Sequence, residues 1–289
     1  MPKNTHRYWF DGKMVAEKEL SWPVLRRGFL YGDGIYDTLR ARNFHLFRWH
    51  DHGQRLAAGR EFFGLASAWN GEALRREMER FLKAAGIADA YVRINCWRTE
   101  PASFPPHGER AAHVMVIARP FEPYPAAWYR RGIVCCVSTF RRNERSPLSS
   151  VKTLNCGENV AARREAEEKT CADAVFLTTT GRLSEATTSN LFFIRKGIVH
   201  TPARSCGILP GVTRKIVFEI CRRSGIRYKE GIFPPASLKT ADEVFLTNTT
   251  AGVLPVREIQ GLFRNARGFS TTGLFRKELE RIFREETDG

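Results

Sequence analysis

The sequence has no uninterrupted apolar run that approaches the ~18 residues of a membrane-spanning helix. Its N-terminus, from Met1 to Phe10, has no apolar core of signal-peptide length. No Cys-x-x-Cys occurs, and the seven cysteines have the spacing of neither a zinc site nor a disulfide framework. These absences argue against a membrane-spanning, a secreted disulfide-rich or a zinc-finger protein. We therefore expect a soluble, cytoplasmic protein with no bound metal.

Acidic residues are scarce relative to basic ones, with 31 Asp and Glu against 46 Lys and Arg and a net charge of +15. Such an excess raises the question of nucleic-acid binding. However, the arginine pairs are dispersed along the chain, and no zinc-finger spacing or RNA-binding aromatic signature accompanies them. We interpret them as a solvated surface that attracts anionic substrates, and we expect neither nucleic acid nor a membrane as partner. A basic nucleic-acid-binding protein remains the non-catalytic alternative.

The chain is long enough for one large or two modest domains, since it has 289 residues with 43% hydrophobic and 27% charged side chains. Pro120-Phe-Glu-Pro-Tyr-Pro125 has three prolines in six residues, which favours a stiff, extended linker. The expected division is a domain at 1–119, a linker at 120–126 and a domain at 127–289. A second proline-rich stretch, 101–108, is expected to be a loop.

Hydrophobic spacing indicates a mixed α+β fold. Apolar residues at helical spacing, including Leu56, Gly59, Phe62 and Phe63, predict a helix over 49–63. Further helices are expected over 72–85, 155–169 and 213–223. Short strands are expected over 44–47, 91–97, 113–118, 132–137, 174–178, 191–194 and 198–201.

Lys152 lies in a Ser-Val-Lys-Thr-Leu-Asn run ahead of a predicted helix. A free lysine has a pKa of about 10.4 and is a poor nucleophile at neutral pH. Burial in a partly apolar site lowers that pKa and lets the amine attack an aldehyde. Val151 and Leu154 are the apolar neighbours that such a site requires. Taken alone, however, the motif fits a surface loop lysine better.

Two downstream motifs change this interpretation. Glu185 is expected at the end of a short strand, where a carboxylate could keep a pyridine nitrogen protonated. The hydroxyl residues Thr188 and Ser189 follow it and can donate hydrogen bonds to the cofactor phosphate. Pro210-Gly211 forms a turn with exposed N–H groups, and Thr213 is expected to cap the next helix, which makes an anion site. An amine, a carboxylate and a phosphate-holding turn are what pyridoxal 5′-phosphate (PLP) requires.

Each of these motifs is weak by itself. A glutamate on an edge strand can simply face water, and any capped helix has free amides at its start. The run Thr247-Asn248-Thr249-Thr250 could add donors at the end of a buried strand or merely close a turn.

Together with further motifs, the chain resembles the class IV (fold type IV) PLP enzymes, a family that includes branched-chain aminotransferases, D-amino acid aminotransferases and aminodeoxychorismate lyases. The resemblance covers nearly the whole length. Arg27-Gly-Phe-Leu-Tyr-Gly-Asp-Gly-Ile-Tyr36 matches the family's first motif, and His52-Gly-Gln-Arg-Leu56 matches the second. The motifs around Lys152, Glu185, Gly211 and Thr249 follow in the family's order.

The resemblance implies a small α/β N-terminal domain and a larger barrel-like C-terminal domain, with the cofactor between them in a homodimer. It implies that Lys152 forms the Schiff base with PLP and shuttles the proton, and that Glu185 pairs with the ring nitrogen. Leu209 would pack on the ring. The phosphate would be held by Arg55, Val212, Thr213 and Thr249, and the substrate pocket would be lined by Tyr36, Tyr91, Arg93 and Thr250.

The substrate is the least determined property. Thr153-Leu-Asn-Cys156 after the lysine is closer to the D-amino acid enzymes and lyases than to the branched-chain enzymes, whereas Tyr91-x-Arg93 favours a transaminase. The arginines that could grip a substrate carboxylate are Arg26, Arg40, Arg93 and Arg98. The leading hypothesis is an aminotransferase that moves an amino group between an amino acid and a 2-oxo acid. The alternative is an aminodeoxychorismate lyase that releases pyruvate and para-aminobenzoate.

Overall fold

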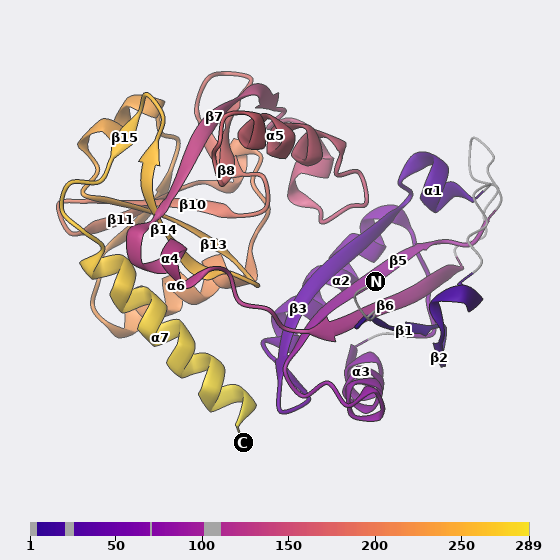
Figure 1. Ribbon diagram of the computed structural model, residues 1–289. Helices are drawn as coiled ribbons and strands as arrows, with labels where there is room; N and C mark the ends of the chain where they lie inside the picture. Colours follow the sequence, from indigo (N-terminus) through magenta and orange to yellow (C-terminus); the bar gives the residue numbers. More distant parts are fainter. Residues whose placement is uncertain (1–4, 21–25, 70, 101–110, 289) are drawn as a thin grey trace. The chain divides into compact units, whose positions relative to one another are not determined.

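The computed structural model describes residues 5–20, 26–69, 71–100 and 111–288, and it divides the chain into two compact units (Figure 1). The first unit comprises Met1–Glu122, Val151–Asn155 and Phe283–Gly289, and the second comprises Pro123–Ser150 and Cys156–Ile282. Both units combine helices with a β-sheet, which confirms the expected α+β class. The proline-rich stretch 101–108, expected to be a loop, lies outside the described residues.

The first unit is built on a six-stranded antiparallel sheet with the strand order β2-β1-β6-β5-β3-β4. Its strands are β1 (Arg7–Phe10), β2 (Lys13–Val15), β3 (Gly34–Arg42), β4 (His45–Leu46), β5 (Ala90–Arg98) and β6 (Ala112–Pro120). Its helices are α1 (Arg27–Tyr31), α2 (Trp49–Phe63) and α3 (Gly71–Ala85). The predicted helix over 49–63 therefore has the bounds of α2.

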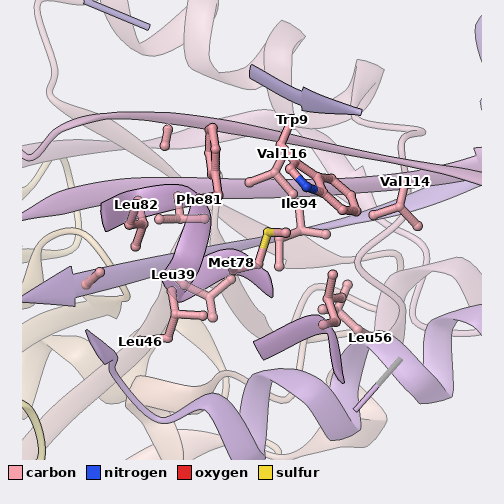
Figure 2. Packing of buried hydrophobic residues seen from close by; sticks show 14 of the residues in the cluster. Trp9, Leu39, Leu46, Leu56, Met78, Phe81, Leu82, Ile94, Val114 and Val116 are labelled. Carbon is pink, nitrogen blue, oxygen red and sulfur yellow. The ribbon is translucent and has the colours of Figure 1, made fainter. Parts of the chain in front are cut away.

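The two faces of this sheet have different side chains because residues alternate along a strand. On one face Leu39 of β3 and Ile94 of β5 pack with Leu56 of α2 and Met78 of α3 in an apolar core (Figure 2). The opposite face carries residues of the other parity, among them Tyr36, Arg93 and Asn95. In α2 the buried positions follow helical spacing, but Phe62, expected on the apolar side, is 46% exposed.

The second unit is built on a nine-stranded half-barrel sheet with the order β12-β11-β10-β13-β14-β7-β8-β9, and with β15 paired to β14. Its strands are β7 (Ile133–Arg142), β8 (Asp173–Thr178), β9 (Leu183–Ala186), β10 (Asn190–Arg195), β11 (Ile198–Pro202), β12 (Tyr228–Gly231), β13 (Glu243–Asn248), β14 (Gly252–Ile259) and β15 (Phe263–Arg264). Its helices are α4 (Ala126–Arg131), α5 (Gly157–Glu168), α6 (Val212–Arg223) and α7 (Ser270–Thr287), whose last residues belong to the first unit.

Buried apolar residues fill both sides of this second sheet. Phe193 and Val244 belong to one cluster, and Phe176 packs with Ala162 and Ala166 of α5 in another. Strands such as β8 are buried at every position, as expected for strands covered on both faces. Among the helices that the structure describes, none is both long and apolar enough to span a membrane.

Candidate active site

The segment around Lys152 is held against the start of β3. Strand β4 pairs only with the far end of β3, at Ala41 and Arg42, so the edge of β3 near Gly34 is open to another partner. The segment takes this edge: Tyr36 N–H donates to the carbonyl of Lys152 (2.9 Å), and Leu154 N–H donates to the carbonyl of Gly34 (3.0 Å). These backbone hydrogen bonds fix the chain from the carbonyl of Lys152 to Leu154 against β3.

Lys152 and Arg93 both lie against the ring of Tyr36. The Nζ atom of Lys152 is 4.5 Å from the ring centroid, and the guanidinium carbon of Arg93 is 3.9 Å from it. Arg93 Nε also donates to Oδ1 of Asn95 (2.9 Å), and Asn95 is the cross-strand partner of Tyr36. The structure thus brings together three of the residues that the sequence predicted: the amine, the aromatic ring and one arginine.

The other candidate substrate residues of this unit have different surroundings. Tyr91 lies two positions from Arg93 on the same face, with the guanidinium of Arg119 over its ring (4.7 Å). Arg98 is instead buried, with Nε 3.0 Å from Oδ2 of Asp33 and Nη2 donating to the carbonyl of Phe63. Its guanidinium is therefore committed to a structural ion pair.

Arg40 also has a structural environment. Its guanidinium carbon lies 3.8 Å from the ring centroid of Phe121 and 4.2 Å from that of Phe283. A cation between two aromatic rings is well stabilised there. Arg26 is the N-cap residue of α1. Arg93 is the candidate arginine that lies against the ring of Tyr36, as Lys152 does.

Arg55 belongs to a buried ion cluster on the helix-covered face of the same sheet. Its Nε donates to Oδ2 of Asp37 (2.9 Å) and its Nη2 to Oδ1 (2.6 Å), while Nδ1 of His52 lies 3.1 Å from the same Oδ1. Burial alone would raise the pKa of Asp37, but Arg55 and His52 hold it well below its usual value of 3.8. Burial lowers the pKa of His52 from 6.5, so its imidazole is mainly neutral at neutral pH.

In the second unit, Glu185 sits at the end of β9 with both carboxylate oxygens in polar contact. Oε2 accepts hydrogen bonds from Nδ2 of Asn190 (3.0 Å) and from the backbone N–H of Leu209 (3.0 Å). Oε1 lies 3.8 Å from Nη2 of Arg142. Two N–H donors and a guanidinium around one carboxylate are suited to its ionised form.

The start of α6 has the free amides that the sequence predicted, but its cap is different. Gly211, and not Thr213, is the N-cap, since Gly211 has extended backbone angles and its carbonyl accepts the first helical hydrogen bond, from Lys215. Thr213 is the second residue of the helix. A Cβ atom on Gly211 would collide with Oδ1 of Asn190, so only glycine lets the chain approach Asn190 this closely. The N–H groups of the first turn point out of the helix start, where an anion is stabilised.

Hydroxyl residues gather at the ends of β9 and β13. Oγ of Ser189 accepts a hydrogen bond from Asn248 (2.9 Å), whose Oδ1 accepts one from the hydroxyl of Thr250 (3.0 Å). Thr249 is half-buried, and no hydrogen bond of its hydroxyl is found among the described residues. The buried hydroxyl of Thr247 also has no hydrogen-bond partner among the described residues. Thr188, by contrast, is exposed.

These residues fit PLP in their chemistry. The first unit supplies a lysine amine and a guanidinium whose Nη1 makes no hydrogen bond within the described residues. The second supplies an oriented carboxylate, a glycine-capped helix start and a buried, unpartnered hydroxyl, that of Thr247. An aldehyde, a ring nitrogen and a phosphate would each find a matching group.

The sequence did not single out some side chains that hold the candidate site residues in place. Asp37 and His52 hold Arg55, and Asn190 and Arg142 hold Glu185. Alternation along β3 could have placed Asp37 on the face opposite Tyr36, and the spacing of three residues could have placed His52 beside Arg55 on a helix. The sequence carries no comparable signal for Arg142.

The chain is similar to known aminotransferases over most of its length. The family model of amino-transferase class IV matches residues 34–259. The D-alanine aminotransferase of Bacillus licheniformis is 26% identical over 253 residues, covering 87% of this chain and 88% of the relative. The branched-chain-amino-acid aminotransferase of Escherichia coli K12 is 26% identical over 269 residues, covering 90% and 87%.

Solved structures are similar over nearly their whole length. The branched-chain aminotransferase of the archaeon Thermoproteus uzoniensis, solved with norvaline, superimposes with a TM-score of 0.90 at 28% identity and covers 97% of this chain and 95% of its own. The branched-chain enzyme of Escherichia coli gives a TM-score of 0.91 at 24% identity, which demonstrates the shared fold.

Proposed function

Because the chain belongs to the class IV aminotransferases, which use PLP, we propose that it exchanges an amino group between a branched-chain or D-amino acid and a 2-oxo acid. In the first half-reaction the donor amino acid would leave as its 2-oxo acid, and in the second a different 2-oxo acid would take up the retained amino group and leave as an amino acid. PLP supplies an aldehyde that binds amines and a ring that accepts the electron pair released at the substrate Cα.

We assign the proton transfer to Lys152. Its Nζ lies against Tyr36, and backbone hydrogen bonds to β3 fix the residues around it. The Lys152 amine would hold the cofactor aldehyde and, when not bound to it, would act as the base that moves the proton at the substrate Cα. The single observation that carries this assignment is that Lys152 is hydrogen-bonded to the edge of β3 with its Nζ 4.5 Å from the centroid of the Tyr36 ring.

The second unit's residues take the roles of cofactor ligands in this proposal. Glu185 keeps the ring nitrogen protonated, and Leu209, whose N–H orients Glu185, packs on the ring. The phosphate is held by donors from both units, and these are Arg55, Thr188, Ser189, Val212, Thr213 and Thr249. Arg93 grips a substrate carboxylate, while Tyr36, Tyr91 and Thr250 line the substrate's position.

A donor screen on the purified holoenzyme tests the function. Each D- or L-amino acid is added alone, and the cofactor absorbance and the 2-oxo acid released are followed. An aminotransferase converts its cofactor to the pyridoxamine form and yields one equivalent of 2-oxo acid. Release of pyruvate and para-aminobenzoate from aminodeoxychorismate, without that conversion, would instead establish the lyase. The L-branched-chain and D-alanine arms separate the two substrate classes.

We also propose that the protein is a cytoplasmic homodimer. Three consecutive apolar residues of α1 are exposed, with Phe29 at 72%, Leu30 at 46% and Tyr31 at 46%. A contiguous exposed apolar surface is typical of an interface. A reducing compartment is supported by the seven cysteines, none of which forms a disulfide within the described chain. Light scattering of the wild-type protein and of Phe29→Ser tests the dimer, which the substitution should weaken.

A further inference from the structure

Asp37 occupies one complete edge of the Arg55 guanidinium. A guanidinium offers five N–H donors in a rigid plane, and its Nε and Nη2 form a two-point contact with the two carboxylate oxygens, at 2.9 and 2.6 Å. Nη1 makes no hydrogen bond within the described residues. The side chain of Arg55 is 12% exposed and that of Asp37 only 1%. The plane of the guanidinium is thus fixed from the core, and its far end is left for another anion.

His52 holds the carboxylate from a second side. Its Nδ1 is 3.1 Å from Oδ1 of Asp37 and 3.2 Å from Nη2 of Arg55. A neutral imidazole can donate from Nδ1 to Asp37 or accept there from Arg55, but it cannot do both. In the first tautomer, one N–H of Nη2 as well as both of Nη1 face away from Asp37. An anion at that end can then be bound at two points.

We propose that Asp37 is a positioning residue for the phosphate of the cofactor, acting through Arg55, with His52 as its support. This inference rests on the proposed function and deepens it. A preorganised guanidinium loses little conformational freedom when it binds an anion, so more of the binding free energy is retained. Asp37 raises the affinity for phosphate by fixing the orientation of the Arg55 guanidinium, although the negative charge of Asp37 itself repels the phosphate.

Because the charge of Asp37 and its orienting effect act in opposite directions, the direction in which Asp37→Asn changes phosphate affinity decides between them. In Asp37→Asn the amide keeps an acceptor for one N–H of Arg55, but it turns a donor toward the other and removes the negative charge. If net charge controlled phosphate binding, the variant would bind phosphate more tightly. If orientation controls it, as we propose, the variant binds phosphate more weakly because Arg55 leaves its fixed plane.

The test compares two ligands that differ only in the phosphate. Apoenzyme prepared from the holoenzyme is titrated with PLP and with pyridoxal. The Kd of pyridoxal divided by the Kd of PLP measures the contribution of the phosphate, and this ratio falls when the phosphate is bound more weakly. Asp37→Asn should reduce this ratio by at least about tenfold, and Arg55→Lys should reduce it similarly. Borohydride reduction of both complexes, followed by peptide mapping, verifies separately that the ligand is attached at Lys152.

A stability control separates positioning from general loss of fold. Glu243 is another buried carboxylate, which accepts hydrogen bonds from the N–H groups of Thr271 and Thr272 at the start of α7. Glu243→Gln should lower the stability of the protein yet leave the ratio of dissociation constants within about twofold of the wild-type value, because a general structural defect weakens the binding of both ligands alike. If Asp37→Asn does not fold, His52→Leu replaces it and should reduce the ratio about threefold.

The outcomes are distinct. An unchanged or increased ratio in Asp37→Asn, or an unchanged one in His52→Leu, overturns the positioning role. Absence of any borohydride-fixed label at Lys152 in the wild-type protein overturns the proposed function instead. A reduced ratio with normal labelling supports both.

Discussion

Arg142 places its Nη2 atom 3.8 Å from Oε1 of Glu185, while its Nη1 donates to Glu158 of α5 and its guanidinium lies over the ring of Phe176. Nε and Nη2 of Arg142 are buried and make no hydrogen bond within the described residues. The cation is thus held by Glu158 and Phe176 at a fixed position near Glu185. Its charge favours the ionised carboxylate that a protonated ring nitrogen needs as partner.

Replacement of Arg142 should therefore weaken catalysis through Glu185. Arg142→Met keeps most of the side-chain volume and should lower kcat about tenfold. In a Glu185→Gln background the same replacement should have little further effect, because the group on which Arg142 acts is already uncharged. Single-turnover rates of the four proteins provide the measurement. If the losses in rate from Arg142→Met and Glu185→Gln were fully additive in free energy, Arg142 would not act through Glu185.

Glu185→Gln should itself slow the proton transfer about 10²-fold, because a neutral amide cannot keep the ring nitrogen protonated. The cofactor should still attach at Lys152, since the amine is untouched. Stopped-flow absorbance with a saturating donor measures the step directly. A rate equal to that of the wild-type enzyme would remove Glu185 from its assigned role.

Lys152→Ala should reduce transamination by at least about 10⁴-fold, since it removes both the amine that binds the aldehyde and the base. The backbone hydrogen bonds from Tyr36 and Leu154 do not involve the side chain, so the fold should persist. Lys169, which pairs with Glu165 on α5, provides a matched control, and Lys169→Ala should keep full activity. Circular dichroism and steady-state assays distinguish lost chemistry from lost structure.

Gly211→Ala should be destabilising because the new Cβ would collide with Oδ1 of Asn190. We expect a loss of about 1–3 kcal/mol in the free energy of unfolding, typical of overpacking, together with slower turnover. Gly273 of α7 is the matched control, since a Cβ there would have no neighbour within 4 Å. Gly273→Ala should be neutral or stabilising by about 0.5–1 kcal/mol in urea denaturation.

Stability should fall as the pH drops below 6.5, in part because of His52. Burial lowers the pKa of His52 in the folded protein below 6.5, so the unfolded chain takes up a proton more readily in that range. The stabilisation from neutral His52 is present above pH 6.5 and is lost as the pH falls toward the folded pKa. Urea titrations at several pH values between about 7.5 and 5.5 should therefore show a steeper decline for the wild-type protein than for His52→Leu. Equal slopes would argue against this.

Much of the fold follows from local patterns. The helical spacing around Leu56 predicted α2, and alternating or wholly apolar runs predicted β5, β8 and β10. The sequence also predicts Lys152 and Glu185 as the main site groups, because their chemistry and the order of motifs resemble one family, and their roles stay predictions. The cap of α6 was assigned to Thr213 instead of Gly211, since composition alone did not reveal the close approach of Asn190.

The side chains that hold the site residues in place could not be predicted in this way, because they contact residues far away in the sequence. Arg142 reaches Glu185 only because β7 and β8 pair in parallel with Arg142 opposite Thr178, so that the end of β7 lies near β9. Likewise Asp37 meets Arg55 because α2 covers one particular face of β3. Such contacts depend on strand register and helix placement, which no short motif encodes.

The short stretch from Val151 to Asn155 leaves the second unit, joins the first through β3 and then returns. The nucleophile therefore cannot acquire its surroundings while residues 123–282 fold alone. Cofactor attachment at this lysine should appear late in refolding, only after the N-terminal sheet has formed. If refolding is stopped with borohydride at successive times, the fraction of chains that carry covalently fixed vitamin B6 would report how many chains have matured.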